Sequence, residues 1–130
     1  MKKIVVLFSL LIAACANMKL DEATAKSKVS EVLELLKNHQ FEKAQELYTS
    51  TFQESEPLEP RIQKMQDIEN VAGSILNYEF IESHAKEVDN ENMLLLKYKI
   101  KCSKVELTEI FSVIIEDGKY KILTQAVTNK

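Results

Sequence analysis

Residues 93–102 read MLLLKYKIKC, and their alternation decides the fold class expected of this chain. Every second side chain is apolar, and this set comprises Leu94, Leu96, Tyr98, Ile100 and Cys102. The last intervening positions are Lys97, Lys99 and Lys101. A period of two residues is typical of a β-strand with one buried and one wet face. The segment therefore predicts a strand of an antiparallel sheet.

The segments around this strand show the same period. Residues 75–84 alternate before it, and residues 104–116 and 119–127 alternate after it. The polar residues 89–92 predict a turn, and Asp117-Gly118 predicts a two-residue hairpin turn. Because consecutive strands usually lie side by side, we expect an antiparallel meander of four strands.

The alternation also predicts which side chains face the core. In residues 75–84 the even positions, from Leu76 to His84, share one face. In residues 119–127 we expect Ile122 and Thr124 on the core face and Gln125 on the opposite face.

The residues before Gly73 repeat their apolar side chains with the period of an α-helix. Residues 22–38, 41–52 and 60–72 each predict one amphipathic helix, and Gly73 supplies a C-terminal cap. A charged loop at 54–60 carries both prolines. Helices followed by strands predict an α+β domain, with three N-terminal helices packed on a curved four-stranded antiparallel sheet.

The composition is that of one folded domain. Hydrophobic residues make up 45% of the 130 residues, and glycine and proline number two each, which excludes disordered and collagen-like chains. The formal net charge is −3. Nucleic-acid binding requires clustered positive charge, so we expect no nucleic-acid partner. No spacing of histidines and cysteines predicts a metal site, and we expect no cofactor.

Residues 1–15 read MKKIVVLFSLLIAAC and have the organisation of an export signal. Lys2 and Lys3 precede an apolar stretch that runs from Ile4 to Ala14. A membrane-spanning helix needs about 20 apolar residues, so this stretch suits a cleaved signal peptide better. The alternatives are an ordinary signal peptide followed by a coincidental cysteine, and an uncleaved membrane helix.

The end of this stretch, Ile12-Ala13-Ala14-Cys15, resembles the lipobox of bacterial lipoproteins. The resemblance implies cleavage between Ala14 and Cys15 and a diacylglyceryl group on the Cys15 thiol. Two acyl chains hold a protein stably at a membrane. The resemblance further implies a place in the cell envelope. In a two-membrane bacterium this is the outer membrane, facing the periplasm; otherwise it is the outer face of the cytoplasmic membrane.

These features divide the chain into three parts. Residues 1–14 are expected to be a lipoprotein signal peptide, and residues 15–21 the lipidated cysteine with its tether. Residues 22–130 are expected to form a single α+β domain.

Two segments of this domain resemble nuclear transport factor two-like domains. They are NHQFEKAQELYTSTF (38–52) and LTEIFSVIIEDGKYKILTQAV (107–127), the second of which resembles the closing hairpin of that family. The resemblance covers about 22–127 and implies a cystatin-like roll. Such domains include isomerases, dehydratases and transport adaptors, so the fold leaves the activity open.

Glu109 is the candidate for chemistry, because it falls among apolar positions of residues 104–116. Burial would raise the pKa of its carboxyl group and suit it to general-base catalysis. Tyr78 and Tyr98 are candidates to complete a pocket around it. Two structural alternatives are a β-bulge near 108–110, which would turn Glu109 to solvent, and an exposed position at the sheet edge.

The row Lys97, Lys99 and Lys101 is a candidate surface for lipid head groups or an acidic partner. The alternative is a solvated face that discourages edge pairing. Cys102 is expected to be a small buried side chain, and His84 is expected to be exposed.

These observations favour a membrane-anchored, non-enzymatic binding or interaction module. Its partners are expected to be the membrane, reached through the lipid anchor, and a protein or small ligand. The alternative is a small isomerase- or dehydratase-type enzyme that uses Glu109 and a tyrosine. The outer face of the sheet is also a candidate homodimer interface.

Overall fold

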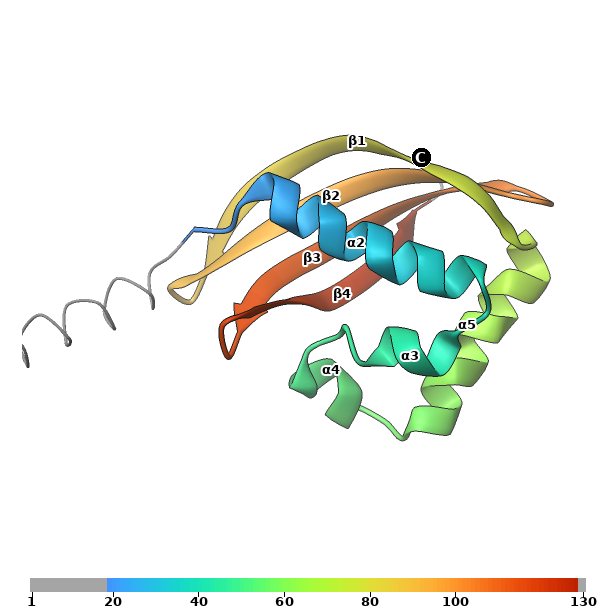
Figure 1. The fold of residues 1–130 in the computed structure, drawn as a ribbon, viewed down its shortest axis with the longest axis horizontal. Helices are drawn as coiled ribbons and strands as arrows, with labels where there is room; N and C mark the ends of the chain where they lie inside the picture. The colour runs from blue at the N-terminus through green and yellow to red at the C-terminus, as the bar shows by residue number, and fades with distance from the viewer. Residues whose placement is uncertain (1–18, 129–130) are drawn as a thin grey trace, which may run out of the picture.

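Four antiparallel strands form one open sheet in the computed structural model, which describes residues 19–128 (Figure 1). The strands pair in chain order, and they are β1 (Ile75–Val88), β2 (Glu91–Cys102), β3 (Glu106–Glu116) and β4 (Lys119–Thr128). Asp117 and Gly118 have the positive φ angles of a tight hairpin turn. The predicted meander and its last turn are therefore confirmed.

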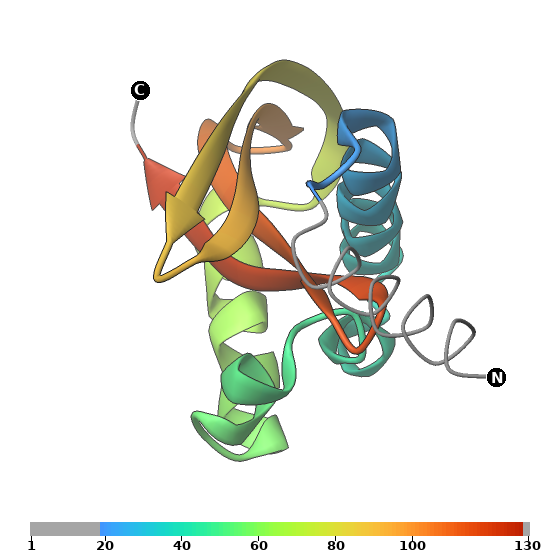
Figure 2. The same cartoon turned by 90° about the vertical axis from the view of Figure 1, so that its left-hand side faces the viewer.

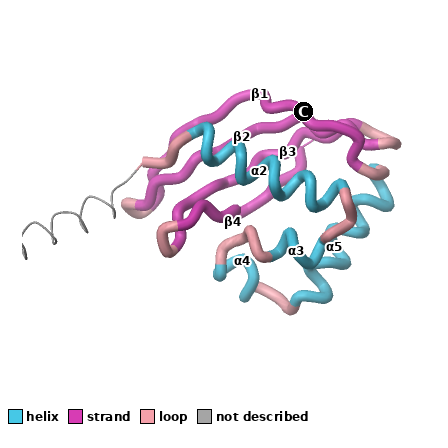
Figure 3. Tube along the Cα trace, in the orientation of Figure 1, coloured by secondary structure: helices cyan, strands magenta, loops and turns pink. Residues whose placement is uncertain are grey.

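Four described helices precede the sheet. They are α2 (Glu22–Lys37), α3 (Phe41–Gln45), α4 (Ser50–Glu54) and α5 (Leu58–Ala72). Figure 1 shows α2 lying across the sheet and the shorter helices gathered beyond β4, and the tube of Figure 3 shows the same arrangement by element type. The view turned by 90° shows that the strands bend and twist (Figure 2). The α+β class is confirmed.

Helix α2 begins and ends where the sequence predicts. The carboxylate of Asp21 accepts hydrogen bonds from the backbone N–H of Thr24 at 2.9 Å and from its hydroxyl at 2.7 Å, which lowers the pKa of Asp21. Asn38 ends the helix. The buried stripe that α2 presents to the sheet consists of Ala25, Val29, Val32, Leu33 and Leu36.

The single helix expected over 41–52 is wrong, because the chain forms two short helices there. Between them the N–H of Ile122 donates to the carbonyl of Leu47, and the N–H of Thr49 donates to the carbonyl of Ile122, both at 2.9 Å. Tyr48 thereby makes an isolated parallel bridge to β4. The edge strand β4 thus hydrogen-bonds to the carbonyl of Leu47 and the N–H of Thr49. A continuous helix would have used both groups for its own hydrogen bonds.

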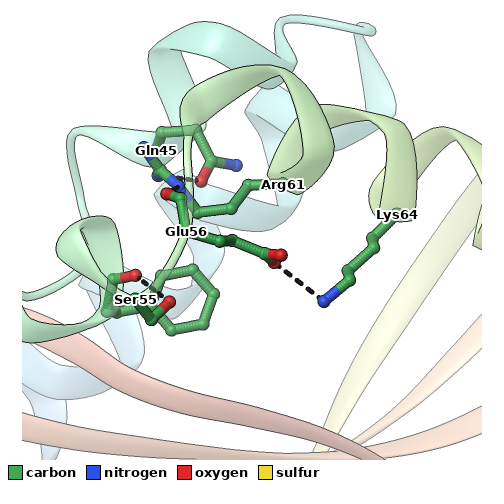
Figure 4. A network of polar contacts seen from close by, with 6 residues as sticks. Gln45, Ser55, Glu56, Arg61 and Lys64 are labelled. Atoms are coloured by element: carbon green, nitrogen blue, oxygen red, sulfur yellow. Dashed lines mark hydrogen bonds and ion pairs between the residues drawn. The ribbon is translucent and has the colours of Figure 1, made fainter.

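The start of α5 is tied to α3 by a buried arginine, Arg61, which is 7% exposed. Its Nη1 donates to Oε1 of Gln45 at 2.6 Å, and its Nε donates to the carbonyl oxygen of Glu56 at 3.0 Å (Figure 4). The carboxylate of Glu56 forms a separate ion pair with Lys64 at 2.8 Å. The helix begins at Leu58, earlier than the predicted start at residue 60.

Bulges in both edge strands overturn part of the predicted facing. In β1 the register shifts between Ile75 and Asn77 and again between Phe80 and Glu82. As a result Leu76 is 49% exposed, whereas an unbroken alternation places it with the core residues. In β4 one extra residue, Leu123, lies between the partners of Ser112 and Val113.

The outer face of the sheet pairs its lysines with carboxylates from the neighbouring strands. Nζ of Lys97 lies 3.8 Å from Glu82, and Nζ of Lys99 lies 3.7 Å from Glu106. Such exposed pairs are worth less than about 1 kcal/mol each. The predicted basic row is thus part of a mixed-charge ladder. His84 on β1 is exposed, as predicted.

Candidate functional site

A cavity of about 50 Å³ lies between α5, the end of α2 and the inner face of the sheet. Its walls are mostly apolar, and they are formed by side chains of α2, α3 and α5 and of the sheet. The main apolar contributors are Leu36, Phe41, Met65, Ile68, Ile75 and Leu107. Four polar or weakly polar residues share the lining, and they are Glu69, Cys102, Glu109 and Gln125. The cavity is therefore an apolar space with carboxyl groups in its wall.

Glu109 faces this cavity and is 4% exposed. The register of β3 with both neighbouring strands is unbroken from Thr108 to Ser112, so no bulge turns Glu109 outward. Since β3 has strands on both sides, the position is not at a sheet edge. Both structural alternatives for this residue are therefore wrong. Burial raises the pKa of Glu109, and a hydrogen bond from Gln125 opposes that shift.

Gln125 and Tyr48 complete a buried polar chain that the sequence did not indicate. The side-chain amide of Gln125 donates to Oε1 of Glu109, and Oε1 of Gln125 accepts from the hydroxyl of Tyr48. Tyr48 is fully buried, and its burial, with the Glu109 charge, raises its pKa. Because the extra residue Leu123 reverses the phase of β4, Gln125 faces inward and its predicted outward direction is wrong.

Tyr78 and Tyr98 point to other partners. The hydroxyl of Tyr78 donates to a carboxylate oxygen of Glu34 on α2 at 2.6 Å. Tyr98 lies opposite Glu109 in the register of β2 and β3, with its hydroxyl hydrogen-bonded to Ser30 of α2. Burial raises the pKa of each tyrosine to about 12. Neither lines the cavity, so of the three candidate pocket residues only Glu109 does.

A second carboxylate, Glu69, lies in the cavity wall on α5. Its Oε1 is 2.7 Å from Nε2 of His39, which belongs to the turn between α2 and α3. His39 has a left-handed backbone, with φ of 60°. Because this pair joins α5 to the α2–α3 turn, it holds together two of the elements that enclose the cavity.

Cys102 occupies the sheet side of the same wall and is 7% exposed, as predicted for a small buried side chain. Burial raises the pKa of its thiol, and the charges of Glu109 and Glu69 raise it further. A thiol in this state stays protonated at neutral pH and is a poor nucleophile. The arrangement therefore offers a buried carboxyl group, rather than a reactive thiol, as its main chemical feature.

No group of three histidine, cysteine, aspartate or glutamate side chains within residues 19–128 is placed to hold a metal ion. No described helix has the length and apolar character needed to cross a membrane. The predicted signal peptide, the predicted lipobox and Cys15 lie outside the described residues, so these predictions stay untested. In comparisons with protein-family models and with curated proteins, no match to this sequence was found.

Proposed function

We propose that this chain is a lipid-anchored protein of the bacterial envelope whose α+β domain is a non-enzymatic binding module. The anchor is Cys15, and Ile12-Ala13-Ala14-Cys15 supports it. The single observation that carries the binding role is the apolar cavity with Glu109 in its wall. Small-ligand sites are typically concave, mostly apolar and equipped with a few placed polar groups. We also propose the nuclear transport factor two-like, cystatin-like roll for this domain.

The position of the described N-terminus is compatible with such an anchor. Lys19 to Asp21 leave the domain beside the β1–β2 and β3–β4 turns (Figure 1). The backbone N–H of Asp21 donates to the hydroxyl of Tyr120 on β4 at 2.7 Å, which fixes the point of departure. The cavity lies toward the opposite end of the sheet, near Gly73 and the β2–β3 turn. A tether at one end therefore attaches the domain at the end opposite to the cavity.

The anchor is tested by metabolic labelling with radioactive palmitate and by intact-mass analysis of the full chain made in a bacterium. We expect the parent protein to incorporate label and to start at Cys15 with added acyl groups. Cys15→Ala is expected to lose the label, whereas the matched control Cys102→Ala keeps it. A mature protein that retains Met1, or a labelled Cys15→Ala variant, contradicts the proposal.

A second candidate is an isomerase- or dehydratase-type enzyme with Glu109 as general base. The observation in its favour is that burial raises the pKa of Glu109 within a cavity. Against it, the hydroxyl of Tyr78 is bonded to Glu34 and that of Tyr98 faces α2. If this enzyme exists, Glu109→Gln abolishes a turnover that the parent shows, with substrate binding retained.

A further inference from the structure

We propose that the cavity beside Glu109 binds an alkylammonium group, meaning a primary ammonium carried on a short aliphatic chain. The inference rests on the proposed function, since it names the ligand class of the binding module. The ammonium would pair with the carboxylate of Glu109, and the aliphatic chain would contact the apolar wall. Such a group exists on small amines and on lysine side chains of proteins.

The first argument is charge. The described residues that line the cavity include two carboxylates, Glu69 and Glu109, and neither lysine nor arginine. Glu69 has His39 as a partner, but none of the ion pairs found within residues 19–128 involves Glu109. A buried carboxylate is costly unless a cation pairs with it. The site therefore favours a cation and repels anions.

The second argument concerns the bond that Glu109 does make. Its Oε1 accepts from the neutral amide of Gln125, whose own oxygen is held by the hydroxyl of Tyr48. This chain orients the carboxylate without neutralising it. Oε2 has no bond from Gln125, and a carboxylate can accept several hydrogen bonds. An ammonium supplies three donors and a full charge, which the amide does not.

The third argument is size and lining. A space of about 50 Å³ accommodates about four water-sized groups, at roughly 10–15 Å³ for each. Four such groups correspond to the nitrogen and the three carbons nearest to it, in a butylammonium or in a lysine side chain. Met65, Leu107 and Phe41 would contact the methylene groups. A neutral alcohol of the same size gains the apolar contacts but leaves the Glu109 charge unpaired.

The test is an NMR titration of the full chain, purified in detergent and labelled at methionine and leucine methyl groups. The reporters are Met65 and Leu107 in the cavity wall, and Met93 is the control methyl outside it. The probes are n-butylammonium and the neutral n-butanol. We expect saturable shifts at Met65 and Leu107 with butylammonium, and at least tenfold weaker binding of butanol.

The matched variants are Glu109→Gln, which removes the charge and keeps the shape, and Glu106→Gln, which removes an exposed carboxylate from the same strand. We expect butylammonium to bind Glu109→Gln at least tenfold more weakly and Glu106→Gln as the parent. The amine–alcohol comparison on the parent decides the question even if Glu109→Gln does not fold. Equal binding of amine and alcohol, an unaffected Glu109→Gln, or no saturable shift overturns the proposal.

A second arm separates the two sources of the group. A short peptide with one lysine is compared with the same peptide carrying norleucine. Preferential binding of the lysine peptide over butylammonium indicates a partner protein, and the reverse indicates a free amine. Failure of every amine leaves palmitate labelling of Cys15 unchanged, so it overturns the ligand class alone. Loss of labelling with amine binding intact overturns the anchor alone.

Discussion

Replacing Gly73 by alanine tests how α5 is joined to the sheet. Gly73 ends α5 with φ of 91° and ψ of 174°, a backbone conformation that is essentially restricted to glycine. A Cβ there would lie 2.1 Å from Oγ of Ser103 and 2.7 Å from the backbone nitrogen of Lys104. The hydroxyl could rotate away, although it would lose its hydrogen bond from the N–H of Ser74. The backbone nitrogen cannot move without shifting the β2–β3 turn.

The expected loss of stability follows from these terms. Backbone strain of this kind costs about 1–3 kcal/mol, and a lost hydrogen bond costs about 1 kcal/mol. Gly73→Ala is therefore expected to lower the free energy of unfolding by about 2–4 kcal/mol, measured by urea denaturation. Gly118→Ala is the matched control, because Gly118 also has a positive φ, of 78°, but nothing lies within 4 Å of its Cβ position. Its expected cost is about 1–2 kcal/mol.

The comparison can refute this reasoning directly. If Gly73→Ala costs no more than Gly118→Ala, the close approach of Ser103 and Lys104 has no energetic weight. Adding Ser103→Ala to Gly73→Ala removes the side-chain clash but leaves the 2.7 Å approach to the backbone nitrogen. We therefore expect the double variant to recover only part of the loss. Full recovery to the level of Gly118→Ala would place the whole effect in the Ser103 side chain.

Three further outcomes are expected. Tyr48→Phe leaves Oε1 of Gln125 without its buried donor and is expected to cost about 1–3 kcal/mol in urea denaturation. A change below about 0.5 kcal/mol, the usual size of the effect of a surface substitution, would argue against the bond. Arg61→Ala removes the donor to Gln45 and is expected to cost more than Lys64→Ala, which breaks an exposed pair worth less than about 1 kcal/mol; equal costs would contradict the structural role. For Glu109 the folded pKa lies above the unfolded one, so its favourable contribution is complete below about pH 4 and is lost as pH rises through the folded pKa. Glu109→Gln lacks this loss, so its stability advantage over the parent should grow with pH, and parallel pH profiles would contradict the burial.

Much of the fold is predictable because period and burial agree. In β2 the alternating residues Leu94 to Cys102 are buried on one face, and Lys99 and Lys101 are exposed on the other. The prediction of one helix over 41–52 is wrong because the interruption of the helix depends on a partner that is distant in sequence. The backbone beside Tyr48 bonds to Ile122, and no property of the helix segment itself reveals that edge.

The candidate site was predictable in one residue and not in its partners. Glu109 is recognisable in the sequence because it is a carboxylate among the apolar residues of one face of β3. The alternation of β3 is not shifted by a bulge at this position. Gln125 was assigned to the wrong face because one extra residue, Leu123, reverses the phase of β4. A bulge leaves the alternation intact on each side of it but in opposite phase, and the mixed polarity of residues 124–127 hides that change in this sequence.

The position of Glu109 also bears on what the cavity is for. A leucine at the same place would bury apolar surface without desolvating a charge, and would therefore stabilise the domain more than the glutamate does. The hydrogen bond from Gln125 gives one structural reason for a glutamate at position 109. It stabilises the bulged register of β4, in which Gln125 faces inward. A glutamine at 109 would accept the same bond. The charge itself therefore adds nothing to the register, whereas the proposed binding of a cation in the cavity would give it a role. Glu109→Gln separates these roles, because it should preserve the fold and its β4 register while abolishing preference for an amine over an alcohol.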